Sequence, residues 1–126
     1  MTKAEAFYDF WSGFGIPAFE ENSLYELDEE PELPYLTYEV ATDAFSDSDT
    51  PLSATLWARS GTWEELDALS ERISAEFGRI GKLLVCDTGK ILLMKRHPFA
   101  QHYGDDADNL TKRVLISVSV RFYTNT

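Results

Sequence analysis

The chain lacks most features that point directly to redox chemistry, to a membrane or to secretion. Its 126 residues include one cysteine, Cys86, so no disulfide can form within the chain. No apolar run approaches the roughly 20 residues that span a bilayer, and the first residues lack the apolar core of a signal peptide. We therefore expect a cytoplasmic protein without membrane contact. Cys86 follows Leu-Leu-Val, which favours a small core residue of a strand over a reactive thiol.

Cations are also scarce. The chain has 11 Lys and Arg against 22 Asp and Glu, for a formal net charge of −11. Such a surface repels DNA phosphates and anionic membranes. The charge is unevenly divided, because the segment from Glu20 to Asp49 holds eleven acids and neither Lys nor Arg. The basic residues come mainly later, at Arg72, Arg79, Lys82, Lys90, Lys95, Arg96, Lys112, Arg113 and Arg121. This division allows the acidic part of one copy to meet the basic part of another, and it equally allows pairing within one chain.

The apolar residues that are present predict two amphipathic helices. Hydrophobic residues make up 44% of the chain and aromatics 13%, enough for the core of a single domain of residues 1–126. Thr2 and Glu5 have the spacing of a capping box for a helix over 2–14, which Gly15 and Pro17 end. Its apolar stripe has i, i+3, i+4, i+7 spacing and consists of Phe7, Phe10, Trp11 and Phe14. A second capping box, Thr62 with Glu65, predicts a helix whose stripe is Leu66, Leu69, Ile73 and Phe77.

Alternating residues predict the strands. Residues 34–42 and 52–59 alternate and predict a hairpin with a long, mobile tip, and residues 82–98 predict two strands around a tight Asp87-Thr88-Gly89 turn. Residues 97–111 read as a loop, and 112–124 as a long, half-buried strand. Residues 20–34 read as irregular chain with its acids in water, pinned to the body by Leu24, Tyr25 and Leu27. The pattern predicts an α+β fold, a two-layer sandwich in which a mostly antiparallel sheet of about five strands carries two helices on one face.

Candidate catalytic and metal-binding residues are few. His97 and His102 lie near Asp105, Asp106 and Asp108, but their spacing matches no familiar ligand pattern. Asp43, Asp47 and Asp49 lack the central glycine and final glutamate of a calcium loop. The Asp87-Thr88-Gly89 triplet resembles the aspartic protease signature, yet Asp and Gly are the residues that a tight turn requires. We predict no metal site, no cofactor and no enzymatic activity.

The order of these elements and four local sequences resemble the small tail-terminator, or tail-completion, proteins of long-tailed bacteriophages and prophages. The four sequences are FYDFWSGFGIPAFEENS, LPYLTYEV, LWARSGTW and EELDALSERI. The resemblance implies a two-layer α+β fold, no catalytic residues, and a hexameric ring at the top of the tail tube. The implied partners are the tail tube protein and the head-tail connector, with DNA passing through the ring without specific binding. The implied location is the bacterial host cytoplasm during assembly, and then the virion tail.

The acidic segment gains two possible roles from this resemblance. We expect either Glu26, Asp28, Glu29 and Glu30, or the loop acids Asp43, Asp47 and Asp49, to face the lumen of the ring or a neighbouring subunit. The tip at 42–51 is a candidate docking element, so deletion of residues 44–49 is expected to leave a folded protein that fails to cap tails. Two alternatives stay open. One is another phage part, a head-tail connector or minor capsid protein, and the other is a small acidic binding or inhibitor protein that imitates nucleic acid.

Overall fold

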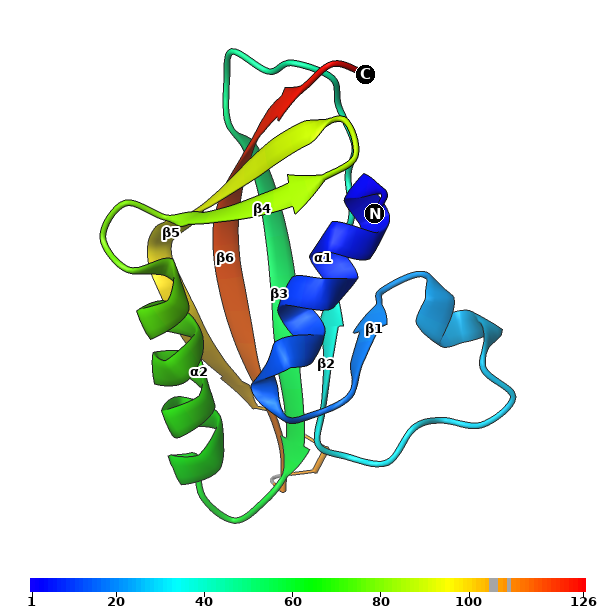
Figure 1. Cartoon of the computed structure of the whole chain (residues 1–126). Coiled ribbons are helices and arrows are strands. Elements are labelled where there is room, and N and C mark those ends of the chain that lie inside the picture. Colours follow the sequence, from blue (N-terminus) through cyan, green and yellow to red (C-terminus); the bar gives the residue numbers. More distant parts are fainter. Residues whose placement is uncertain (105–106, 109) are drawn as a thin grey trace.

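The computed structural model describes residues 1–104, 107–108 and 110–126. It combines two α-helices with one curled sheet of six strands in the order β1-β2-β3-β6-β5-β4 (Figure 1). The helices are α1 (Lys3–Trp11) and α2 (Glu64–Phe77). The strands are β1 (Ala18–Glu20), β2 (Tyr35–Tyr38), β3 (Thr50–Arg59), β4 (Lys82–Cys86), β5 (Gly89–Gly104) and β6 (Thr111–Thr124). Within the described ranges, no helix has the length and apolar character needed to cross a lipid bilayer.

The predicted α+β class is confirmed, but the predicted sheet of about five, mostly antiparallel strands is not fully correct. The sheet has six strands and is mixed, because β1 pairs with β2 in parallel while the other four pairings are antiparallel. The extra strand, β1, has only three residues, which is too short for an alternating pattern to be visible. Its register, with Ala18 opposite Leu36, joins segments that are distant in sequence.

The predicted loop over residues 97–111 is also wrong in its first half. β5 continues to Gly104, and its register with β6 shifts between Lys95 and Ala100. Beyond the shift, Ala100 lies opposite Ile116 and His102 opposite Val114. The irregularity breaks the alternation of apolar residues, and most side chains of this half of β5 are exposed. A strand without an alternating pattern therefore reads as a loop in the sequence.

The first helix follows its prediction closely at its start. The Thr2 hydroxyl accepts a hydrogen bond from the Glu5 N–H at 3.1 Å, and the Glu5 carboxylate accepts one from the Thr2 N–H at 2.9 Å. These bonds lower the pKa of Glu5. The α-helix ends at Trp11, and a 3₁₀ turn continues to Phe14 before Gly15, at φ 88°, takes the left-handed conformation that ends the helix.

The second helix begins later than predicted. Trp63 occupies the position before the helix, and Thr62 does not cap it. The Trp63 ring stacks on the His102 ring with centroids 3.8 Å apart, which fixes this turn by side-chain packing. The first turn instead carries the acids Glu64, Glu65 and Asp67, which complement the positive end of the helix dipole.

One core lies between the helices and the inner face of the sheet. Both helices contribute to it, with Phe7 and Phe10 from α1 and Ile73 and Phe77 from α2. The inward residues of β6 follow the predicted alternation, and all five are buried: Val114, Ile116, Val118, Val120 and Phe122. Cys86 is 8% exposed, as predicted for a core residue. The aromatic stripe of α1 thus has the partner expected for it, a broad apolar sheet.

Burial of Tyr38 in this core makes stability depend on alkaline pH. Desolvation raises the pKa of the Tyr38 phenol from 10.0 to about 12. The folded state therefore holds this proton more tightly than the unfolded chain does. The contribution of this phenol to the free energy of unfolding is fully present below pH 10, and it is lost as the pH rises from 10 towards 12.

Denaturant unfolding at pH 9 and pH 11.5 should show that Tyr38→Phe loses less stability over this interval than the wild type. Tyr25→Phe, at an exposed site, should behave as wild type, and equal losses in all three proteins would contradict this assignment.

Candidate interaction surfaces

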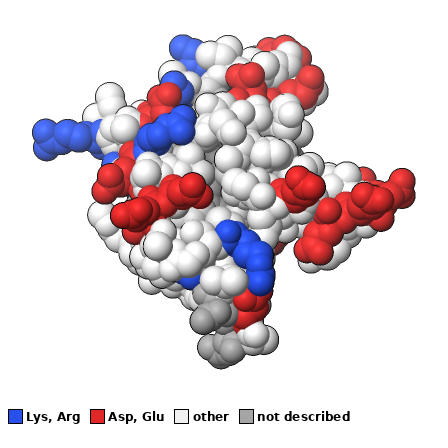
Figure 2. All heavy atoms as spheres, turned by 90° about the horizontal axis from the view of Figure 1, so that it is seen from below, with Lys and Arg blue, Asp and Glu red and all other residues white. Residues whose placement is uncertain are grey.

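A projecting acidic segment joins the parallel strands β1 and β2, and we call residues 21–33 the acidic arm. It carries six acids and neither Lys nor Arg. It leaves the sheet at the β1 edge and extends away from the body, where its exposed charges are negative (Figures 1 and 2). Its base is held by the Glu20 carboxylate, which accepts hydrogen bonds from the Ser23 N–H at 2.9 Å and the Ser23 hydroxyl at 3.0 Å. Partial desolvation opposes ionisation of Glu20, but these bonds and those from Asn22 outweigh it and lower its pKa.

Four of the predicted site residues lie on this arm. Glu26, Asp28, Glu29 and Glu30 are all exposed, and none of them forms an ion pair within the described residues. The prediction that Tyr25 pins the segment to the body is wrong, because its side chain is 84% exposed. Leu27 is 43% exposed, and Leu24 is half-buried. The arm therefore presents an exposed tyrosine and leucine among carboxylates.

The other three predicted site residues lie apart from the arm, in the segment between β2 and β3. Asp43, Asp47 and Asp49 are exposed. Asp49 pairs with Arg121 of β6 at 2.5 Å, which raises the pKa of the Arg121 guanidinium. One member of the acidic segment is therefore neutralised by a later basic residue of its own chain. The structure does not bring the two acidic groups together into one surface.

The segment between β2 and β3 is attached to the end of β6 and does not form a free tip. Ser46 is 7% exposed, its N–H donates to the Phe122 carbonyl at 3.0 Å, and its hydroxyl accepts from the Phe122 N–H at 2.8 Å. The Thr124 hydroxyl donates to the Ala44 carbonyl at 2.7 Å. Deletion of residues 44–49 would remove these bonds and leave buried backbone groups without partners. We therefore replace the expectation of a folded deletion variant with one of a destabilised protein.

The outer face of the sheet carries a row of stacked side chains that sequence reasoning missed. Tyr35, Trp57, Arg113 and Tyr103 lie opposite one another across β2, β3, β6 and β5. The rings of Tyr35 and Trp57 stack at 6.2 Å, and the Arg113 guanidinium lies 5.3 Å from the Trp57 ring and 5.9 Å from the Tyr103 ring. We call these four residues the aromatic-arginine row. Alternation over residues 52–59 places Trp57 opposite in direction to Leu56, but only the register of the sheet aligns Trp57 with the other three side chains.

Arg113 is the cationic centre of this row. Its side chain is half-buried, and in the described part of the chain it forms cation-π contacts but no ion pair with a carboxylate. Beside it lies a shallow hollow of about 270 Å³ lined by Thr55, Tyr103, Arg113 and Leu115. The Trp57 indole is fixed because its N–H donates to the Thr37 hydroxyl at 3.0 Å. Tyr35, at the β2 end of the row, is buried, whereas Trp57 and Arg113 are half-buried and Tyr103 is exposed. The row is therefore a preformed surface that is accessible from Trp57 to Tyr103, with a positive charge at its centre.

The outward positions of the sheet carry more basic than acidic residues. Outward positions of the strands carry four basic residues, Arg59, Lys90, Arg113 and Arg121, and one acid, Glu39. Arg59 pairs with Asp108, and Arg121 with Asp49. Glu39 accepts hydrogen bonds from the Ser53 N–H and hydroxyl, each at 2.7 Å. Lys90 and Arg113 are therefore the two cations of this set that have no partner among the described ion pairs, and they suit this face to an acidic partner.

The residues weighed as metal ligands do not assemble in the described part of the chain. No group of three His, Cys, Asp or Glu side chains lies close enough there to hold a metal ion. His102 pairs with Asp67 at 2.6 Å, whereas His97 is exposed on β5. Asp108 pairs with Arg59, and its pKa is lowered mainly by the Leu110 N–H. Asp105 and Asp106, named with these histidines, lie outside the described residues.

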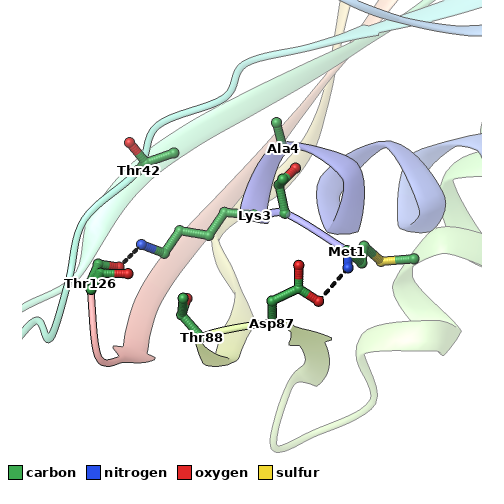
Figure 3. Close-up of a pocket in the computed structure, with 8 residues that line it drawn as sticks. Met1, Lys3, Ala4, Thr42, Asp87, Thr88 and Thr126 are labelled. Atoms are coloured by element: carbon green, nitrogen blue, oxygen red, sulfur yellow. Dashed lines mark hydrogen bonds and ion pairs between the residues drawn. The ribbon is translucent and has the colours of Figure 1, made fainter.

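A second hollow, of about 360 Å³, lies where both ends of the chain meet the β4-β5 turn (Figure 3). The Met1 amine donates to the Asp87 carboxylate, and Lys3 donates to the Thr126 carbonyl. The hydrogen bond to the Asp87 carboxylate raises the pKa of the Met1 amine. Asp87 and Thr88 form the predicted turn, and Gly89 is required there because a Cβ would lie 2.2 Å from the Tyr123 carbonyl oxygen. The polar groups of this hollow bind one another and connect α1 to the sheet.

In comparisons with known proteins, no family model and no curated sequence matches the chain. The resemblance to tail-terminator proteins therefore depends on the order of the elements and on the local sequences alone. The acidic arm and the aromatic-arginine row are the two surfaces from which a function can be argued.

Proposed function

We propose that the protein is a structural component of phage assembly, a tail terminator that forms a ring on the tail tube and joins it to the head. The observation that carries the proposal is the acidic arm, which projects from the body with six acids, no cation and an exposed Tyr25. A second, different surface of the same chain, the outer sheet face, presents Arg113, a cation without a partner among the described ion pairs. Two unlike complementary surfaces on one chain are what a head-to-tail ring requires.

The charge of the chain also suits a ring through which DNA moves. A net charge of −11 leaves a surplus of carboxylates after the described ion pairs are formed. Carboxylates around a channel repel phosphates, so DNA passes without being held. Asp43 and Asp47, which form no ion pair in the described part of the chain, are candidates for this lining.

The proposal is tested in the phage or prophage that carries the gene. Deletion of the gene should give tails of irregular length that do not join heads, and the purified protein should restore uniform tails and appear as a ring at the tube end in negative-stain images. A missense variant that unfolds the protein, such as Leu56→Asp at a fully buried site, serves as the inactive control. Tails of normal, uniform length in the deletion strain would contradict the proposal.

A second candidate, an acidic binding or inhibitor protein, is favoured by the same uniformly negative arm. In that case the arm would imitate a nucleic-acid backbone and cover a basic surface on another protein. Gel filtration separates the two candidates, because an inhibitor forms a stable complex of fixed stoichiometry with a basic partner and does not form rings. A head-tail connector of the same phage is distinguished by its position in the particle, at the head vertex instead of the tube end.

A further inference from the structure

We propose that the acidic arm of one copy docks on the aromatic-arginine row of the next copy, with Tyr25 in the hollow beside Arg113. This inference builds on the proposed function, because it names the contact that would hold the ring together. It identifies one occupant for the outer sheet face, a second copy of this chain.

The acidic arm and the aromatic-arginine row carry charges of opposite sign. Arg113 lies between two rings and has no carboxylate partner among the described ion pairs. The arm carries six acids without a cation, and its Glu26 and Asp28 flank the exposed Leu27. Bringing an arm carboxylate to Arg113 would form a charge-assisted hydrogen bond on a surface that the rings already shield from water. The charges of these two surfaces are therefore complementary.

The exposed Tyr25 of the arm and the hollow beside Arg113 offer an apolar contact. Tyr25 is 84% exposed, and the next residue, Glu26, is also exposed, so a ring and a carboxylate of the arm are both accessible to a partner. The hollow of about 270 Å³ beside Arg113 is walled by the Tyr103 ring and the Leu115 side chain. Tyr, Trp and Arg are the residues that contribute most to binding energy at protein interfaces. Both surfaces thus have such residues at their centres.

The direction in which the arm leaves the sheet favours contact with another copy. The arm leaves the sheet beside β1 and extends outward from that edge, whereas the row runs from β2 across to β5 (Figure 1). Tyr25 forms no ring contact with the row of its own chain. An arm that extends from the β1 edge, with Tyr25 outside the ring contacts of its own row, can reach the row of another copy. Because the two surfaces differ, repetition of this contact generates a head-to-tail chain, which closes into a ring when the rotation allows.

Exchange of charges tests the contact in the full chain. The arm variant Glu26→Lys/Asp28→Lys and the row variant Arg113→Glu should each weaken self-association at least about tenfold in sedimentation equilibrium. The two sets combined in one chain should restore much of the association. The matched controls are Glu64→Lys/Glu71→Lys and Arg79→Glu, at exposed positions on or beside α2, and they should behave as wild type. The inference is wrong if the arm variant and the row variant each associate as strongly as the wild type. It is also wrong if the chain that carries both sets of substitutions associates as weakly as either variant alone.

A second measurement reports the contact even if the free protein remains monomeric. A synthetic peptide of residues 20–34 is added to the ¹⁵N-labelled full chain, and NMR shifts are followed. The peptide should move the Trp57 indole and the Arg113 and Tyr103 amide signals, and Arg113→Glu should abolish these shifts. No shift at about 1 mM peptide, or the same shifts in Arg113→Glu, would overturn the inference. Shifts of the same signals with a single-stranded oligonucleotide, but not with the peptide, would also overturn it and assign the row to nucleic acid.

The inference and the proposed function can fail separately. If deletion of the gene disrupts tails while Arg113→Glu restores them fully, the terminator proposal stands and this contact is wrong. If the peptide binds the row but the deletion leaves tails uniform, the contact is real and belongs to a different assembly.

Discussion

Replacing Phe10 by alanine is expected to lower the free energy of unfolding by about 3–5 kcal/mol. The Phe10 ring lies 4.9 Å from Trp11, 5.4 Å from Phe14 and 5.5 Å from Phe77, all centroid to centroid. The contact with Phe77 joins α1 to α2, so truncation opens a cavity between the helices as well as above the sheet. For a chain of this size, the loss corresponds to a fall in melting temperature of roughly 10–20 °C.

Denaturant unfolding and calorimetry measure this effect. Tyr8→Ala is the matched control, because Tyr8 lies on the same helix but is 54% exposed, and it should change stability by no more than about 0.5 kcal/mol. A double-mutant cycle with Phe77→Ala should give a coupling of about 0.5–1.5 kcal/mol, the range for edge-to-face aromatic pairs. Equal effects of Phe10→Ala and Tyr8→Ala would show that the aromatic cluster does not form the core.

Removing the acidic arm should have the largest effect on assembly and a small effect on folding. Residues 22–32 are replaced by six glycine and serine residues, which can reach from the end of β1 to the start of β2 at up to roughly 3.3 Å per residue. The arm side chains are mostly exposed, so stability should change by no more than about 1 kcal/mol. Ring assembly should weaken at least about 100-fold, because Tyr25 and the arm carboxylates are lost together.

Sedimentation velocity and thermal unfolding of the same preparations separate these two effects. The control keeps the arm and its length but replaces its two neutral polar residues, Asn22→Ala and Ser23→Ala. It should assemble like the wild type, with only the small change expected from loss of the Glu20 hydrogen bonds. An armless protein that still forms rings of normal stability would exclude the arm from the ring contact.

Local patterns in the sequence predicted much of the fold. The capping box of Thr2 and Glu5 and the alternation of β6 each depend on neighbours within a few residues, and both are confirmed. The second capping box failed because a long-range contact, the stacking of Trp63 on His102, competes with Thr62 for the start of α2. Similarly, β1 is a strand because of its partner β2, and three residues carry no pattern of their own.

The candidate surfaces were predictable only in part, for the same reason. The acidic arm is a run of like charges and can be seen in the sequence. Assembly of the aromatic-arginine row depends on the registers that place Trp57 opposite Arg113 and Arg113 opposite Tyr103. Tyr103 also lies beyond the register shift in β5, where the sequence has no alternating pattern and predicts a loop. The sequence allows the acidic segment to pair within the chain or between copies, and Asp49 pairs within the chain, with Arg121.

A photo-crosslinker at position 25 is the most direct test of the central claim, that the arm of one copy lies on the outer sheet face of another. Assemblies are formed from a mixture of ¹⁴N and ¹⁵N chains carrying a photoreactive phenylalanine in place of Tyr25, and crosslinked peptides are identified by mass spectrometry. The account predicts mixed-isotope crosslinks from the arm to the strands that hold Trp57, Tyr103 and Arg113. Crosslinks confined to single chains, or directed to the α2 surface, would contradict it.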